Sequence, residues 1–367
     1  MHTAVRQAVS LAFIFLTFVT AAAAAPAAAF DDATLARQSY EKIILPGYAR
    51  FDEAAHALAE KTAALCASPS VDSLAAARGA ARTAIIVWGR IEPVRFGPIT
   101  QKQRLDRLLF FPDAHGFTAK QTARLLAKQD EADIDPAKLA GASVAVQGFG
   151  ALDVALFGHG SDELATTDAK AAFRCRYVNA LALDIAEIAR ATLAQWQGDY
   201  GRLWLHPGDE NKTYLSDKET TQALYRAYVT QIEVLRLQRL ATLDSNAKKT
   251  ATALLPNSKL ALPFVLAGIE GERDIIGDDG FSAPDLSTTD KEADAVALLG
   301  SVVTDLGFAL RAGEAAAAMS SDPLNDPAAR ERLTPLLLSL KNAEDIGRAA
   351  LGQLTGQTLG FNSLDGD

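Results

Sequence analysis

Apolar residues recur at spacings of three and four along most of the chain, which is the period of one buried helical face. No window shows a sustained alternation of apolar and polar residues, the pattern of a half-buried strand. The chain is therefore predicted to be all-α and built of helical bundles. The stripes with helical spacing are, in chain order, Tyr48–Leu65, Leu74–Trp88, Phe173–Trp196, Leu224–Leu235, Val296–Leu310 and Leu333–Ile346.

Residues that favour helix starts stand ahead of several of these stripes. Pro46 precedes the first stripe, and Asp168 is predicted to cap the long helix that ends near Trp196. Asp135, followed by Pro136 at the first helical position, predicts another capped helix. The segment Thr118–Gln121 fits a capping box, so a helix is expected to begin there.

Three segments rich in Gly and Pro interrupt the helical pattern, at residues 89–100, 198–212 and 256–288. They are predicted to be irregular, and long irregular segments often carry function. The middle segment divides the mature chain into two halves of comparable size. We predict an N-terminal helical bundle over residues 30–205 and a C-terminal helical bundle over residues 206–367.

The first 29 residues have the pattern of a secretory signal peptide. Arg6 precedes the apolar run Ala8–Thr20, and alanines follow up to Ala29, so cleavage is expected there or a few residues earlier. The run is shorter than the ~20 residues of a membrane span. The alternative is a retained anchor. No Cys lies near the cleavage region to carry a lipid, and no later segment is expected to span a membrane. The mature protein is predicted to be exported to the periplasm or cell envelope.

Composition narrows the possible partners. Hydrophobic residues make up 49% and charged residues 22% of the chain, which is typical of a folded protein. The net charge of −9 argues against nucleic acid, because phosphate binding needs a basic surface. Cys66 and Cys175 are the only two cysteines, and in an oxidising compartment such a pair is expected to form a disulfide. The alternative is two buried free thiols.

Conventional catalytic motifs are absent from the sequence. There is no His-Glu-x-x-His zinc motif, no Gly-x-Ser-x-Gly elbow and no phosphate-binding loop. Glu53 and His56 lie on one helical face, as in di-iron bundles, but such a bundle needs a second copy of the motif. A solvated helix face is the favoured interpretation of this pair.

Four segments carry a family resemblance through their order and spacing. They read WGRIEPVRFGPI at 88–99, RLLFFPD at 107–113, VQGFGALDVALFG at 146–158 and LGFNSLDGD at 359–367. Following a signal peptide, they resemble the imelysin family of bacterial envelope proteins, and most of all its periplasmic, iron-regulated branch. The resemblance implies an all-α fold of two helical-bundle domains with a site near their interface.

The resemblance also implies a candidate metal site, and the sequence departs from it. Imelysins are grouped with the metallopeptidases, and related domains occur in periplasmic iron-uptake components. The family signature is Gly-x-His-x-x-Glu, which falls here on Gly148, Gly150 and Asp153. Gly150 has no side chain to bind a metal or move a proton. Asp153 keeps a carboxylate, but a single carboxylate is a weak metal site without further ligands.

The same four segments supply other polar candidates. Arg95 is of a type that clamps a carboxylate or phosphate. We expect the candidates to converge with Gly148, Gly150 and Asp153 near the interface of the two halves. They form either a ligand site or a salt-bridge network that ties loops together. These further candidates are Glu92, Arg95, Asp113, Asp365 and Asp367.

Three functional hypotheses follow. The first is a non-enzymatic exported protein that binds a ligand or metal and is linked to iron acquisition, an association that comes wholly from the resemblance. The second is a metallopeptidase, which the loss of the signature His at Gly150 disfavours. The third is an envelope scaffold that docks a partner protein. No cofactor is certain under any of them, and iron or another divalent metal is the candidate.

Overall fold

The computed structural model describes residues 30–243, 253–286 and 290–359, so the predicted signal peptide and the tail with Asp365 and Asp367 lie outside the described residues. The described residues form helices and contain no β-strand, which confirms the all-α prediction. The α-helices are α1 (Asp32–Gln38), α2 (Leu45–Ala67), α3 (Val71–Ile91), α4 (Arg104–Leu108), α5 (Phe117–Lys128), α6 (Pro136–Ala140), α7 (Gly148–Phe157), α8 (Ala169–Gln197), α9 (Asp199–Leu205), α10 (Asp217–Glu233), α11 (Ala261–Ile276), α12 (Asp290–Met319), α13 (Pro327–Arg332) and α14 (Thr334–Thr355).

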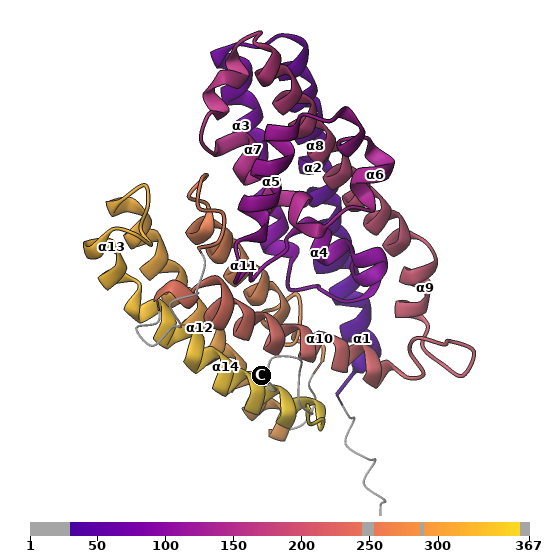
Figure 1. The fold of residues 1–367 in the computed structure, drawn as a ribbon. Helices are drawn as coiled ribbons and strands as arrows, with labels where there is room; N and C mark the ends of the chain where they lie inside the picture. The colour runs from indigo at the N-terminus through magenta and orange to yellow at the C-terminus, as the bar shows by residue number, and fades with distance from the viewer. Residues whose placement is uncertain (1–29, 244–252, 287–289, 360–367) are drawn as a thin grey trace, which may run out of the picture.

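The long helices lie in two groups that follow chain order (Figure 1). In the first half, α2 packs along both α3 and α8, and α7 lies against α8. In the second half, α12 packs along α14 and α11. Helix α11 also lies along α3 and so joins the two groups. The predicted division after residue 205 falls between α9 and α10, and the assignment of two domains stays a prediction.

The predicted apolar stripes point into the core. Tyr48, Phe51 and Trp88 are fully buried, and the rings of Phe51 and Trp88 lie 5.1 Å apart, which holds α2 against α3. Farther along, Trp196 in α8 stands 5.9 Å from Trp204 in α9. Aromatic pairs at such distances add to the burial of their apolar area. The helical spacing in the sequence therefore identified the buried faces of these helices.

The predicted disulfide is present. Cys66 in the last turn of α2 is bonded to Cys175 near the start of α8, with an S–S distance of 2.04 Å. The bond joins residues 109 positions apart in the sequence. It therefore fixes two helices that already pack along each other.

The predicted helix caps are confirmed at two places and wrong at a third. Asp168 accepts a hydrogen bond from the Lys170 N–H at 2.8 Å, and Asp135 accepts one from the Ala137 N–H at 3.1 Å. Helix α5 does not begin with a capping box at Thr118. It begins one residue earlier, and its cap is supplied from outside the helix by Asp113, as described below.

The segment 256–288 was predicted to be irregular, and this is wrong for the 16 residues Ala261–Ile276, which form α11. Pro263 lies in the first turn, where a missing N–H costs nothing. Gly271 is required by packing, since a Cβ there would lie 2.0 Å from the carbonyl oxygen of Arg90. The missing Cβ at Gly271 allows the backbones of α3 and α11 to approach closely. Residues 199–205 are likewise helical, as α9.

Helix α12 also differs from expectation. By length and composition alone, Glu292–Met319 is long and apolar enough to cross a membrane, whereas no segment after the signal was expected to be. Core helices of soluble proteins pass the same test, and only 33% of the apolar window is buried in the protein. One face of α12 packs along α14 and α11, so the helix belongs to the bundle.

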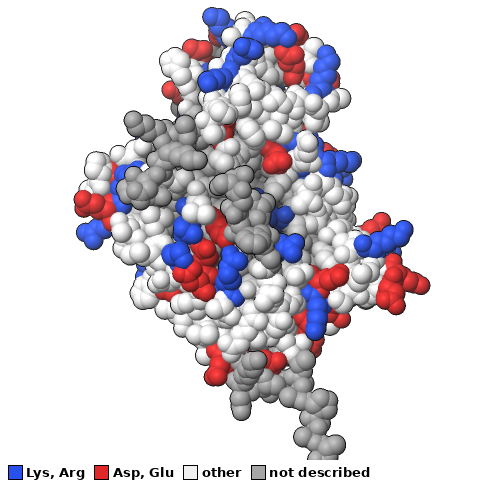
Figure 2. All heavy atoms as spheres, turned by 60° about the horizontal axis from the view of Figure 1, so that its bottom comes forward, with Lys and Arg blue, Asp and Glu red and all other residues white. Residues whose placement is uncertain are grey.

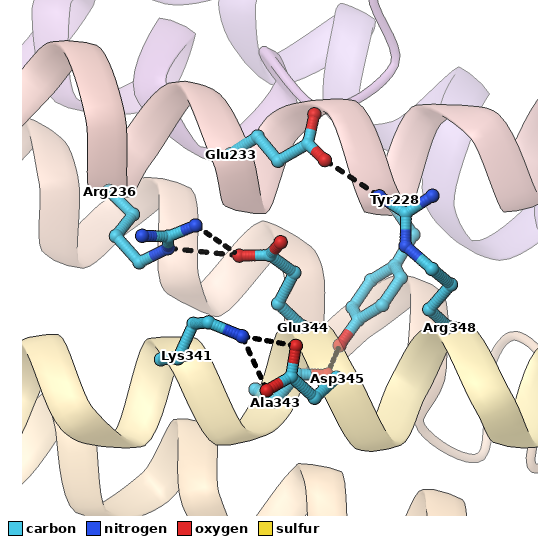
Figure 3. A network of polar contacts seen from close by, with 8 residues as sticks. All are labelled: Tyr228, Glu233, Arg236, Lys341, Ala343, Glu344, Asp345 and Arg348. Carbon is cyan, nitrogen blue, oxygen red and sulfur yellow. Dashed lines mark hydrogen bonds and ion pairs between the residues drawn. The ribbon is translucent and has the colours of Figure 1, made fainter. Parts of the chain in front are cut away.

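Polar contacts hold α10 and the π-helical turn Val234–Arg239 against α14 (Figure 3). Arg236 binds Glu344 at 2.8 Å, and Arg348 binds Glu233 at 2.7 Å. Between these pairs, the Tyr228 hydroxyl donates a 2.6 Å hydrogen bond to the Ala343 carbonyl. A buried apolar helix face and these ion pairs therefore fix the register of the two helices together.

Candidate functional site

A cavity of about 260 Å³ lies beside α7, the helix that carries the family signature in altered form. Helix α5 and the segment 253–257, which precedes α11, complete its walls. Most of its lining is apolar, and Asp113, Gly150 and Asp153 lie together in it, as the sequence predicted for these three residues. Its apolar lining includes Leu109, Phe110, Phe111, Val154, Leu254 and Leu255.

The two signature glycines have different roles. Gly148 has φ of +62°, and a Cβ there would lie 2.1 Å from the Arg107 carbonyl oxygen. It serves a close backbone contact and does not line the cavity. Gly150 does line the cavity, and a Cβ there would lie 3.2 Å from Cγ2 of Thr118, which stands on the opposite wall. A side chain at this position would therefore press against Thr118, which would have to shift to admit it.

Asp153 is 1% exposed, and its carboxylate is already engaged. It accepts hydrogen bonds from the backbone N–H of Asn257 at 3.0 Å, the Asn257 side-chain amide at 2.8 Å and the backbone N–H of Ser258 at 2.8 Å. These contacts join α7 to the segment before α11, 104 residues farther along the chain. A metal at Asp153 would have to replace or share these donors.

Asp113 is the second carboxylate of the cavity. It is 7% exposed and accepts hydrogen bonds from the backbone N–H groups of Phe117 and Thr118, each at 2.8 Å, so it caps α5. Burial would raise the pKa of Asp113, but these N–H donors outweigh it and hold that pKa below its ordinary value. The carboxyl is therefore ionised at neutral pH. Among the described residues, no Lys, Arg or His lines the cavity, so these residues favour a cation over an anion as an ionised ligand.

Glu92 and Arg95 lie in a separate buried network and not in the cavity. Glu92 binds Arg239 at 2.5 Å and accepts a 2.8 Å hydrogen bond from the amide of Gln231. Arg95 donates to the other end of the same amide at 2.9 Å. Burial acts to raise the pKa of Glu92, but Arg239 and Arg95 hold it below the ordinary value. The network adjoins the cavity wall, since the Arg239 guanidinium carbon lies 5.1 Å from the ring centre of Phe111.

Glu272 was not among the predicted site residues, and it lies in α11 within the segment predicted to be irregular. It is fully buried, and neither carboxyl oxygen has a hydrogen-bond partner. Burial raises its pKa well above the ordinary value, and Arg95 only partly opposes this. Burial therefore favours the protonated form of this carboxyl more than it would in an exposed glutamate. Arg239 and Asn257 were not predicted either. Each hydrogen-bonds a residue more than a hundred positions away in the sequence, Glu92 and Asp153 respectively.

Metal ligands do not gather at the cavity. Within residues 30–243, 253–286 and 290–359, no group of three or more His, Cys, Asp or Glu side chains is placed to hold one ion. On the face of the molecule shown in Figure 2, acidic and basic side chains lie next to one another. The cavity is thus the feature of the predicted site that is best formed for a small ligand.

Comparison with known proteins gives one family and two similar structures. The family model described as Imelysin (Peptidase_M75) matches residues 44–345. An imelysin-like protein from Psychrobacter arcticum 273-4 has a TM-score of 0.73 at 20% identity, over 91% of this chain and 100% of that one. A putative iron-regulated protein A precursor from Parabacteroides distasonis ATCC 8503 has a TM-score of 0.66 at 15% identity, over 87% and 95%. No curated protein sequence gives a significant match.

Proposed function

This chain belongs to the imelysin family, and from that premise we propose that it is an exported cell-envelope protein that binds a small ligand in the cavity beside α7 without acting as an enzyme. The observation that carries the proposal is the cavity itself, whose described lining has an apolar wall and two buried carboxylates but no basic side chain. The disulfide supports export, because such bonds persist in oxidising compartments. The link to iron acquisition rests on the name of one similar structure.

The lining indicates the class of ligand. Asp113 accepts hydrogen bonds from the N–H groups of Phe117 and Thr118, and Asp153 accepts three, and both carboxylates face the cavity as acceptors. An anion would face two carboxylates, with no compensating cation among the described lining residues. We therefore expect a small, largely apolar molecule that carries one cationic or donor group. A volume of about 260 Å³ is enough for one aromatic ring with a short substituent.

A metallopeptidase is less well supported. Gly150 cannot supply the signature imidazole, and the carboxylate of Asp153 already binds three N–H donors. Peptidase chemistry of the zinc type requires three protein ligands and an open position for water. The cavity residues offer two carboxylates, both engaged in fixing neighbouring segments.

A matched pair of probes tests the proposal. Phenethylamine and phenylacetate have the same ring and nearly the same size, but opposite charge. Binding to the mature protein is measured by thermal shift and by NMR titration. We expect the amine to stabilise the wild-type protein and phenylacetate to have no effect. Preference for the anion, or the absence of binding by both probes, would contradict the proposal.

A pair of glycine variants localises the binding. Gly150→Leu fills the cavity, whereas Gly79→Leu places the same side chain in helix α3, where no atom lies within 4 Å of the added Cβ. Binding of the amine should be lost in the first variant and kept in the second. Metal analysis after dialysis completes the test. Stoichiometric iron or zinc that disappears on Asp153→Ala would favour metal binding over this proposal.

A further inference from the structure

Helix α12 presents an exposed face on the side opposite to its packing face. The buried residues Leu299, Val302 and Leu306 face α14 and α11. The opposite side includes Phe308, which is 52% exposed, and Leu298 at the edge of the packing face is 40% exposed. This combination explains why the helix is apolar enough to resemble a membrane span while only a third of its apolar window is buried.

The exposed face has the spacing of a helix–helix seam. Its members follow steps of three and four over 22 positions, which is the heptad pattern of paired helices. Between the charged ends the side chains are small or apolar, and small side chains let two helices approach closely. In chain order the exposed members are Asp294, Ala297, Ser301, Thr304, Phe308, Arg311 and Ala315.

The charges on this face are complementary to each other at the two ends. Asp294 and Arg311 are both exposed, and neither forms an ion pair within the described part of the chain. Arg311 instead lies over the ring of Phe308, with its guanidinium carbon 4.5 Å from the ring centre. The two residues are 17 positions apart, or about 26 Å along the helix, so they cannot bind each other within one copy.

We propose that this face of α12 is an interface with a second copy of the same chain, related by a two-fold axis that passes the helix between residues 302 and 303. An antiparallel pairing about that axis places Asp294 of each copy opposite Arg311 of the other. The same register places Ala297 opposite Phe308, so a small residue receives the ring, and Ser301 opposite Thr304. An isologous contact of this kind closes with two copies.

A second copy fits the face better than a lipid surface does. Helices that lie on membranes carry Lys and Arg beside large apolar side chains. This face carries a serine and a threonine at its centre and an aspartate at one end. Because the seam is short, the dimer is expected to be weak and to depend on concentration.

Sedimentation equilibrium of the mature protein, from about 1 to about 200 µM, tests the interface. The wild-type protein should approach a dimer at the upper end. Asp294→Arg and Arg311→Asp should each weaken the dimer at least tenfold, since each places like charges opposite one another. The double variant D294R/R311D should restore it, because the pairing is then merely reversed. Arg332→Asp, on α13, is the matched control and should leave the dimer unchanged.

Three results would overturn the proposal. A wild-type protein that stays monomeric throughout the range has no such interface, and binding to vesicles of phosphatidylcholine and phosphatidylglycerol in that case would assign the face to a membrane. A dimer that survives both single variants uses another surface. Single variants that dissociate without rescue by the double variant contradict the antiparallel register. Circular dichroism confirms that each variant is folded.

Discussion

The carboxylate of Asp153 in α7 and the backbone N–H of Ser258, just ahead of α11, are joined by a 2.8 Å hydrogen bond. Ser258 is 4% exposed, so its N–H cannot turn to solvent if the carboxylate is removed. A residue at a family signature position thus acts here as a clamp between the two halves of the chain.

Removal of that clamp should be measurable as a loss of stability. Asp153→Ala leaves a buried N–H of Ser258 without an acceptor, which costs about 1–3 kcal/mol. Urea unfolding should show this loss, and the exposed Asp162→Ala should show little change, since its ion pair with Arg78 lies at the surface. Equal stability of the two variants would mean that the clamp contributes nothing.

Glu92 should give stability that is lost in acid. Its folded pKa lies below the ordinary value, because Arg239 and Arg95 outweigh the effect of burial. The unfolded state therefore takes up the proton first as pH falls, and the contribution present at neutral pH disappears below about pH 4.5. Glu92→Gln, which leaves Arg239 buried without its partner, should cost about 3–5 kcal/mol at pH 7.

Unfolding of both proteins between pH 7 and pH 3 checks this prediction. The difference between wild type and Glu92→Gln should narrow as pH falls. A difference that stays constant with pH would show that packing, and not charge, is what the substitution removes. The double variant E92Q/R239M should lose less than the sum of its single variants, because the two side chains form one ion pair.

Glu272 should have the opposite pH dependence. Its folded pKa is raised well above the ordinary value by burial, so the folded protein keeps a proton that the unfolded chain releases. Stability should therefore fall as pH rises above about 4.5, by up to about 1.4 kcal/mol per pH unit, until the folded pKa is reached. Glu272→Gln should remove this slope and be more stable than wild type at pH 7.

Chemical unfolding across pH 4–8 provides the measurement, and the exposed Glu331→Gln is its control. A control with an unchanged slope and a Glu272→Gln protein with a flatter one would support a buried neutral carboxyl. If Glu272→Gln keeps the wild-type slope, the carboxyl is charged in the folded protein and its pairing with Arg95 is stronger than the structure indicates.

The disulfide should account for a large share of the stability. A bond between residues 109 positions apart stabilises by about 5 kcal/mol in the chain-entropy model. The exported protein should show no free thiol when labelled under denaturing, non-reducing conditions. The variant C66A/C175A should unfold at a much lower urea concentration, and two reactive thiols in the native protein would contradict the bond.

The sequence predicted the helices through local rules, and it failed where a rule depended on a distant neighbour. The helix with the stripe from Tyr48 to Leu65 and the cap at Asp168 could be predicted, because helical spacing and capping depend on residues only a few positions apart. Helix α11 was not predicted because glycines in a sequence indicate a loop. The role of Gly271 depends on its packing against the Arg90 carbonyl of α3, which the sequence alone does not show.

The candidate site was predictable to a similar extent. The family signature drew attention to Gly150 and Asp153, and the structure places both at one cavity with Asp113. The partners of these residues were not predictable, because the contact between Asp153 and Asn257 spans 104 positions. Nothing in the sequence predicted that Glu272 would be buried, because buried carboxyl groups normally have a hydrogen-bond partner.

The bond between Cys66 and Cys175 encloses residues 67–174 in a covalent ring. Two walls of the cavity, at residues 109–119 and 150–154, belong to that ring, whereas the third wall at residues 253–257 does not. Oxidation therefore limits how far the first two walls can separate, even in a partly unfolded protein. The third wall lies outside the ring and is attached by hydrogen bonds to Asp153, so the disulfide places no covalent limit on its separation from the other two.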